Sequence, residues 1–200
     1  MKNLFEFYGI QSPLRQELVK GVLKRFQIKE FHEIESNIKN LLEVPQRECH
    51  YAALDLAIRF AAKAPYEYID LYEYMIVKNS WWDTVDIIAS TLHGKHFTKF
   101  PELIESKTSS WINSENLWLK RSCILFQLKY KEKTDKDLLS SFIQKCLNSK
   151  EFFINKAIGW SLREYSKTNP DWVINFVKSN ELTPLSEKEA LRIIKKRTKA

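Results

Sequence analysis

The chain has 200 residues with a net charge of +7, and apolar residues make up 44% of it. This length suffices for one large domain with a substantial core, the apolar share excludes a disordered chain, and no apolar run reaches the length of a membrane span. The excess of positive charge favours a polyanionic partner, with nucleic acid as the first candidate and an inert basic surface as the alternative.

The first half of the chain is predicted to form five helices. Ser12 followed by Pro13 is typical of a helix start, because serine accepts hydrogen bonds from first-turn amides and proline suits the first helical position. Further along, Asn79 or Ser80 is expected to cap a helix that ends before Gly94. The five predicted helices cover residues 12–26, 30–42, 46–63, 67–77 and 81–92.

Six further helices are expected in the second half. Ser114 is predicted to cap the first strong one, and Asn169 before Pro170 is a second combination of cap and proline. Ser186 and Glu189 have the spacing of a capping box, in which the two side chains bond to each other's backbone amides. The six helices cover residues 100–111, 115–129, 135–147, 151–165, 171–177 and 186–197.

These segments predict an all-α fold without a convincing β run. Successive helix pairs begin roughly every 35–40 residues, which is the period of HEAT-like solenoids. The repeat is one of pattern only, so a compact helical bundle remains the alternative. Because no linker or low-complexity stretch interrupts the chain, we expect a single domain over residues 1–200.

Neither a disulfide nor a metal site is expected. Cys49, Cys123 and Cys146 are odd in number and lack CxxC spacing, and the N-terminus has no signal-peptide core, so we expect reduced thiols in a cytoplasmic protein. His93 and His96 have no third ligand nearby, and we interpret them as part of a surface loop. We therefore predict no metal or cofactor. We also expect the protein to be a monomer.

The most informative motif is Trp-Trp-Asp-Thr-Val-Asp at residues 81–86. On a helix, Trp82 and Asp86 are four residues apart and share a face. Trp81 belongs to a different stripe, which continues through Val85 and has the apolar period of a buried face. An aromatic ring beside a carboxylate suits a ligand that is cationic or becomes cationic.

Two later helices carry basic residues in unusual settings. Arg121 lies on the apolar side of its helix, where a buried guanidinium needs an anion, either in a ligand or in an ion pair within the protein. Lys156, Trp160 and Arg163 share one face, so that a ring is flanked by two cations, which suits a nucleic-acid backbone. We predict that Lys120, Lys156 and Arg163 bind DNA.

Gly159 lies in the middle of a predicted helix, where it costs about 1 kcal/mol relative to alanine. A glycine at such a position permits close approach of another helix or of a ligand backbone. The sequence leaves both explanations open.

Together these strings resemble the bacterial AlkD-type DNA glycosylases of the HEAT-like-repeat DNA alkylation repair superfamily. The resemblance runs from about residue 7 to the C-terminus, and it is most specific at residues 80–86, 117–122 and 151–166. It implies a solenoid with a concave DNA-binding face, which hydrolyses the N-glycosidic bond of purines alkylated at N3 or N7 in duplex DNA.

The resemblance also assigns residues to the cleft. The catalytic carboxylate of the family falls on Asp86, its two cleft tryptophans on Trp82 and Trp160, and its cleft arginine on Arg121. Arg121 is then expected to anchor a phosphate near the lesion or to hold Asp86 in place. The family contacts its lesion through the backbone while the base remains stacked, so base flipping is not expected.

One departure from the family leads to alternative functions. Relatives usually begin with a further helical segment that helps to grip DNA, and this segment is expected to be absent from the chain. A DNA-binding relative that lacks glycosylase activity for this reason is the first alternative. A protein-interaction scaffold, as many HEAT arrays are, is the second.

Overall fold

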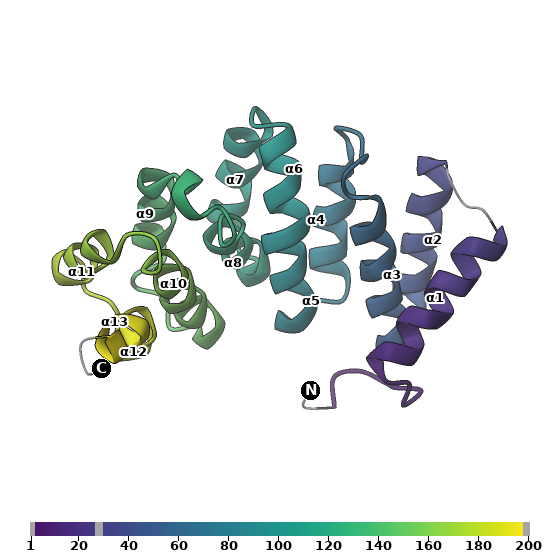
Figure 1. The fold of residues 1–200 in the computed structure, drawn as a ribbon, viewed down its shortest axis with the longest axis horizontal. Coiled ribbons are helices and arrows are strands. Elements are labelled where there is room, and N and C mark those ends of the chain that lie inside the picture. Colours follow the sequence, from purple (N-terminus) through teal and green to yellow (C-terminus); the bar gives the residue numbers. More distant parts are fainter. Residues whose placement is uncertain (1–2, 27–29, 198–200) are drawn as a thin grey trace.

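The protein, seen in a computed structural model, forms a helical-repeat solenoid over the described residues 3–26 and 30–197. Figure 1 shows the helices stacked in chain order along an arc. The N-terminal and C-terminal ends of the array both bend towards the lower edge of the view. The predicted all-α solenoid is thus confirmed, and the compact bundle is not. Residues 1–2, 27–29 and 198–200 of the predicted domain lie outside the described residues.

The helices of the first half are α1 (Ser12–Phe26), α2 (Phe31–Glu43), α3 (Arg47–Phe60), α4 (Tyr68–Lys78), α5 (Trp82–Ile87) and α6 (Gly94–Lys99). Those of the second half are α7 (Leu103–Asn113), α8 (Leu117–Leu125), α9 (Lys136–Lys145), α10 (Phe152–Tyr165), α11 (Pro170–Ser179), α12 (Pro184–Ala190) and α13 (Arg192–Arg197). A short 3₁₀ turn, η2 (Lys131–Lys133), precedes α9. The described residues contain no β-strand.

Residues 82–99 form one continuous helical rod, because a π-helical segment, η1 (Ile88–His93), joins α5 to α6. The prediction that Gly94 ends a helix is therefore wrong. Gly94 has helical dihedral angles, and a Cβ added to it would lie 2.7 Å from the carbonyl oxygen of Phe126. The glycine allows the end of α8 to pack closely against the rod. At the start of the rod, the extended residue Trp81 holds the N-cap position that was predicted for Asn79 or Ser80.

Among the other helix starts, one predicted cap is confirmed and two are wrong. The side chain of Asn169 accepts a hydrogen bond from a first-turn amide of α11, as predicted. In α8 this role belongs to Asn116 and not to Ser114. In α12 it belongs to Thr183, whereas Ser186 is fully buried and donates to a backbone carbonyl of α10. In both cases the predicted cap is a polar residue that lies close in the sequence to the observed cap.

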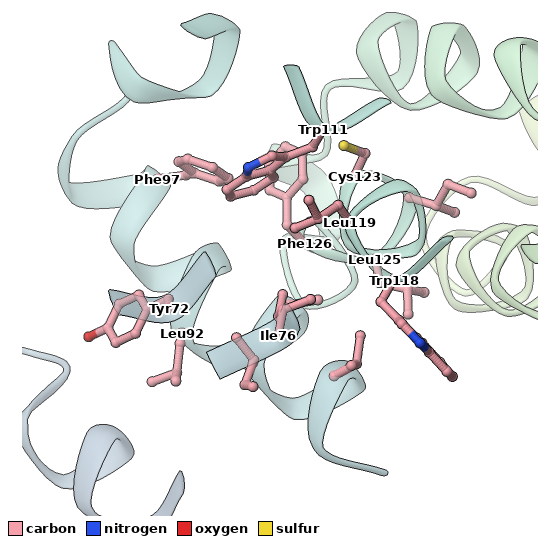
Figure 2. Packing of buried hydrophobic residues seen from close by; sticks show 14 of the residues in the cluster. Tyr72, Ile76, Leu92, Phe97, Trp111, Trp118, Leu119, Cys123, Leu125 and Phe126 are labelled. Atoms are coloured by element: carbon pink, nitrogen blue, oxygen red, sulfur yellow. The ribbon is translucent and has the colours of Figure 1, made fainter. Parts of the chain in front are cut away.

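Large apolar side chains form a core that continues along the array. Phe97, Trp111 and Phe126 pack together at its centre, while Trp118 lies apart from them (Figure 2). Each such side chain, when fully buried, stabilises the fold by roughly 1.5–3 kcal/mol. Val85 is fully buried, as its predicted stripe requires. Within the described ranges, no helix has the length and apolar character needed to cross a membrane.

The two histidines of the predicted surface loop are buried instead. His93 is completely inaccessible and stacks on Trp111 with 4.6 Å between the ring centroids. His96 is only 2% exposed and contacts the backbone carbonyl of Tyr66. The prediction failed because it rested on the helix ending before Gly94. Once the helix continues, both rings fall on its inward face.

Candidate functional site

A groove of about 450 Å³ lies where α5, α8 and α10 meet the C-terminal helices α12 and α13. It brings together six of the seven predicted site residues from positions far apart in the chain. These six are Trp82, Asp86, Arg121, Lys156, Trp160 and Arg163. The exception is Lys120, which lies outside the groove and near Cys146, where its charge counteracts the rise in the thiol pKa that burial causes.

The centre of the groove is an ion pair between Asp86 and Arg121. The Asp86 carboxylate accepts one hydrogen bond from Arg121 Nε at 2.7 Å and another from Nη2 at 2.9 Å. Arg121 also donates to the backbone carbonyl of Phe153. Such two-point pairing is the strongest and most directional form of this contact. The anion that buried Arg121 needs is therefore Asp86, and the pair fixes the direction of the carboxylate.

Asp86 carries its negative charge in a place with little water. Burial raises the pKa of Asp86, and the hydrogen bonds and charge of Arg121 counteract that rise. Asp86 is only 8% exposed, yet it lines the groove. A charge with so little hydration interacts more strongly with a nearby positive charge than the same group does in open water.

Aromatic rings line the groove beside the ion pair. Trp82, at the start of α5, is 47% exposed, and Trp160 of α10 is half-buried. Sequence reasoning missed Phe152 and Phe153, which also line the groove and contact each other edge to face. The spacing held a usable signal, because Phe152 is four residues before Lys156 and so shares the cationic face of α10.

A second carboxylate, from Glu189 of α12, lies on the basic wall of the groove. It accepts a hydrogen bond from Lys156 Nζ at 2.9 Å and another from Arg163. Two of the three cations predicted to bind DNA are thus paired with one residue. These contacts lower the pKa of Glu189, the Lys156 hydrogen bond most of all, and burial offsets only part of that lowering. Nothing local in the sequence predicts this contact, because α10 and α12 are separate in the chain.

Gly159 allows α12 to pack directly against α10. A Cβ added to Gly159 would lie 2.6 Å from Glu189 Cβ and 2.9 Å from the carbonyl oxygen of Ser186. Neither distance is compatible with an ordinary side chain, so any residue larger than glycine would push α12 away. Of the two explanations that the sequence left open, close helix packing is the one observed.

The other aspartate of the motif, Asp83, anchors α5 rather than facing the groove. Its carboxylate accepts hydrogen bonds from Arg47 Nη2 at 2.7 Å and from the Tyr51 hydroxyl at 2.5 Å. Arg47, from α3, is fully buried and also donates to Thr84 Oγ1 at 2.9 Å. This network ties the start of α5 to the preceding repeat and so positions Trp82 and Asp86.

The groove combines an ionised carboxylate, exposed rings and a basic wall. This set can bind a polyanion along the wall while stabilising a positive charge near the carboxylate and rings. In the part of the chain that the structure describes, no three His, Cys, Asp or Glu side chains lie together as a metal site would require.

Comparison with known proteins agrees with this chemistry. A family model described as "DNA alkylation repair enzyme" matches residues 1–194. A solved structure, described as a predicted DNA alkylation repair enzyme from Enterococcus faecalis, has 35% sequence identity and a TM-score of 0.87. The match covers 95% of this chain and 89% of that chain. Among curated proteins, none matches.

Proposed function

The chain belongs to the DNA alkylation repair enzyme family, and we propose that it is a DNA glycosylase acting on purines alkylated at N3 or N7 in duplex DNA. The observation that carries this proposal is the Asp86 carboxylate, fixed by Arg121 and lining the same groove as Trp82 and Trp160. Repair of alkylated DNA is the role of the family. The choice of lesion and of reaction follows from what the family resemblance implies for these four residues.

A purine alkylated at N3 or N7 is formally cationic, which makes it a good leaving group. When the C1′–N bond breaks, its electron pair goes to the base and neutralises that charge, so no general acid is needed. The sugar becomes cationic in the transition state, and the Asp86 carboxylate stabilises it electrostatically. A water molecule then bonds to C1′ and loses a proton, which Asp86 can accept as a general base.

The rings of Trp82 and Trp160 favour a positive charge next to their faces. Each such contact contributes about 0.5–2 kcal/mol, depending on how far water is excluded. Because the lesion is already cationic before the reaction, part of this energy binds substrate and transition state equally. We therefore assign lesion preference mainly to the rings and rate mainly to Asp86.

The groove also supports contact with the lesion through its sugar–phosphate backbone. Trp82 and Phe152 are 47% and 55% exposed, so they form an open wall rather than a lined pocket for a flipped base. Many enzymes that act on bases turn the base out of the duplex into such a pocket. We propose that in this protein the alkylated base remains stacked while the groove acts on its sugar.

The direct test is chromatography of free bases released from methylated duplex DNA. Asp86→Asn keeps the shape of the side chain and removes its charge, so base release should fall by about 10²–10⁴-fold. DNA binding should persist, and a thermal melt should show that the variant is folded at the assay temperature. Normal release of 7-methylguanine by this variant would contradict the catalytic assignment.

Two measurements on the unmodified protein separate the alternatives: base release, and DNA binding across a series of salt concentrations. DNA binding that weakens steeply with salt, without base release at high protein concentration, would indicate a DNA-binding protein without this activity. Salt-insensitive behaviour towards DNA would indicate a protein-interaction scaffold.

A further inference from the structure

The basic wall of the groove is built around a carboxylate of the protein itself. Lys156 Nζ lies 2.9 Å from Glu189 Oε1, Arg163 donates to Oε2, and Arg192 Nη1 lies 3.9 Å from the same oxygen. Three cations from α10 and α13 thus surround one anion. This arrangement resembles a phosphate site with the phosphate replaced by a side chain.

The stem of Glu189 is fixed, whereas its side chain is partly exposed. Helix α12 packs so closely on α10 that a Cβ added to Gly159 would lie 2.6 Å from Glu189 Cβ. The side chain of Glu189 is 18% exposed, so its end reaches solvent. The carboxylate can therefore leave its partners by rotation beyond Cβ, without any movement of the helix.

The basic wall keeps a net positive charge that can bind a DNA phosphate. Lys156, Arg163 and Arg192 supply three positive charges against the single negative charge of Glu189, whereas Asp86 and Arg121 neutralise each other. A lysine has three donors and an arginine five, so Glu189 uses only part of the donor capacity. A phosphate oxygen accepts the same charged hydrogen bonds as a carboxylate oxygen.

We propose that Glu189 is the resident counter-ion of this wall, and that a DNA phosphate replaces it at Lys156 and Arg163 when the duplex binds. The inference rests on the proposed function, since it requires that DNA occupies the groove. Glu189 positions the two cations in the free protein and lowers the affinity for DNA of any sequence. Binding by charge alone is thereby weakened, and discrimination is left to Trp82, Trp160 and Asp86.

The test is the affinity of Glu189→Gln for undamaged duplex DNA, measured across a series of salt concentrations. Because the variant has no ion pairs to break, it should bind about 3- to 10-fold more tightly than the unmodified protein. The slope of log affinity against log salt should change by less than about 0.9, which is the value for one phosphate contact, because both proteins contact the same phosphate.

Glu187→Gln is the matched control, because it removes the same charge from an exposed position of α12 outside the groove. It should change affinity much less. In a Lys156→Gln background, the gain from Glu189→Gln should shrink, since one of the two cations is already lost. Glu189→Asp keeps the charge but shortens the reach, so it should shift affinity in the same direction by a smaller factor.

Equal or weaker DNA binding by Glu189→Gln would overturn the inference, as would an equal gain in Glu187→Gln. Either result, with salt-sensitive DNA binding by the unmodified protein, leaves the proposed function intact. A failure of the unmodified protein to bind DNA would refute the proposed function, and this inference with it.

Discussion

Helix α5 carries two aspartates three residues apart, and each is paired with a buried arginine from a different helix. Asp83 pairs with Arg47 of α3 at 2.7 Å, and Asp86 pairs with Arg121 of α8 at 2.7 and 2.9 Å. Both are aspartate–arginine pairs, yet it is the second that lines the groove with Trp82. The surroundings of each pair therefore decide its role: the Asp83 pair anchors α5, and the Asp86 pair belongs to the candidate site.

Several groups hold both terminal nitrogens of the Arg47 guanidinium. Beyond Asp83, it donates to Thr84 Oγ1 and to the backbone carbonyl of Asn79, both at 2.9 Å, and it lies 4.0 Å from the ring centroid of Phe5. All of these contacts come from the protein itself. Asp86 instead lines a groove together with exposed rings and the basic wall. The comparison thus predicts that the first pair supports stability and the second supports activity.

The largest expected effect is on the anchor. Asp83→Asn leaves the charge of fully buried Arg47 without its anion, which typically costs about 3–5 kcal/mol in the free energy of unfolding. Urea denaturation measures this loss. Base release per folded molecule should change little at temperatures well below the melting transition.

Asp86→Asn is the matched variant for this measurement. Its stability loss should be smaller, because Arg121 lines the groove and is 4% exposed, whereas Arg47 is fully buried. If Asp83→Asn proves as stable as the unmodified protein, or loses base release while folded, the division between anchor and site is wrong.

The second effect is on the site. Arg121→Gln removes the group that aims Asp86, and a misplaced catalytic group can cost about 100-fold in rate. It also removes the hydrogen bonds and charge that lower the pKa of Asp86. The active form is the carboxylate, so rate is lost as pH falls through this pKa. The acid limb of the profile of base release against pH should therefore move to higher pH.

Arg121→Lys separates the two parts of this effect. Lysine keeps a positive charge but cannot make the two-point contact. The Arg121→Lys variant should therefore keep much of the lowering of the Asp86 pKa while its rate of base release falls. An unchanged pH profile in Arg121→Gln would show that Asp86 does not set the acid limb.

Local patterns in the sequence predicted the helices well, because an apolar stripe and a polar cap act within a few residues. The pairing of Trp82 with Asp86 on one face follows from the same periodicity. The partners of these residues could not be predicted locally. Glu189 reaches Lys156 only because α12 packs on α10, and Asp83 is an anchor only because Arg47 approaches from another repeat.

Gly94 illustrates the limit most clearly. A glycine near the end of an apolar stripe is typical of a helix terminus, but it also permits close approach of another helix. The choice depends on whether Phe126 lies against it, which is a tertiary fact. The error carried over to His93 and His96, because their burial follows from the continuation of the helix past the glycine.

The smallest of these effects concerns His93. It distinguishes the loss of stability at low pH from the loss of base release at low pH. Burial, with smaller contributions from the charges of His96 and Lys107, lowers the pKa of His93 to about 3 from its usual value of about 6.5. The native protein keeps this ring neutral while the unfolded chain takes up a proton. Its contribution to stability is therefore complete above pH 6.5 and is lost as pH falls towards 3. At pH 5 the loss is about 2 kcal/mol.

His93→Phe should remove this loss, because phenylalanine keeps a ring against Trp111 and cannot be protonated. Urea denaturation at pH 7 and pH 5 should show a smaller decrease in stability for the variant than for the unmodified protein. Some decrease should remain, since burial also lowers the pKa of His50 and His96. An equal decrease in both proteins would contradict the assignment to His93. If the acid limb of base release is the same in His93→Phe, that limb reports the groove and not unfolding, and the shift in Arg121→Gln can be attributed to Asp86.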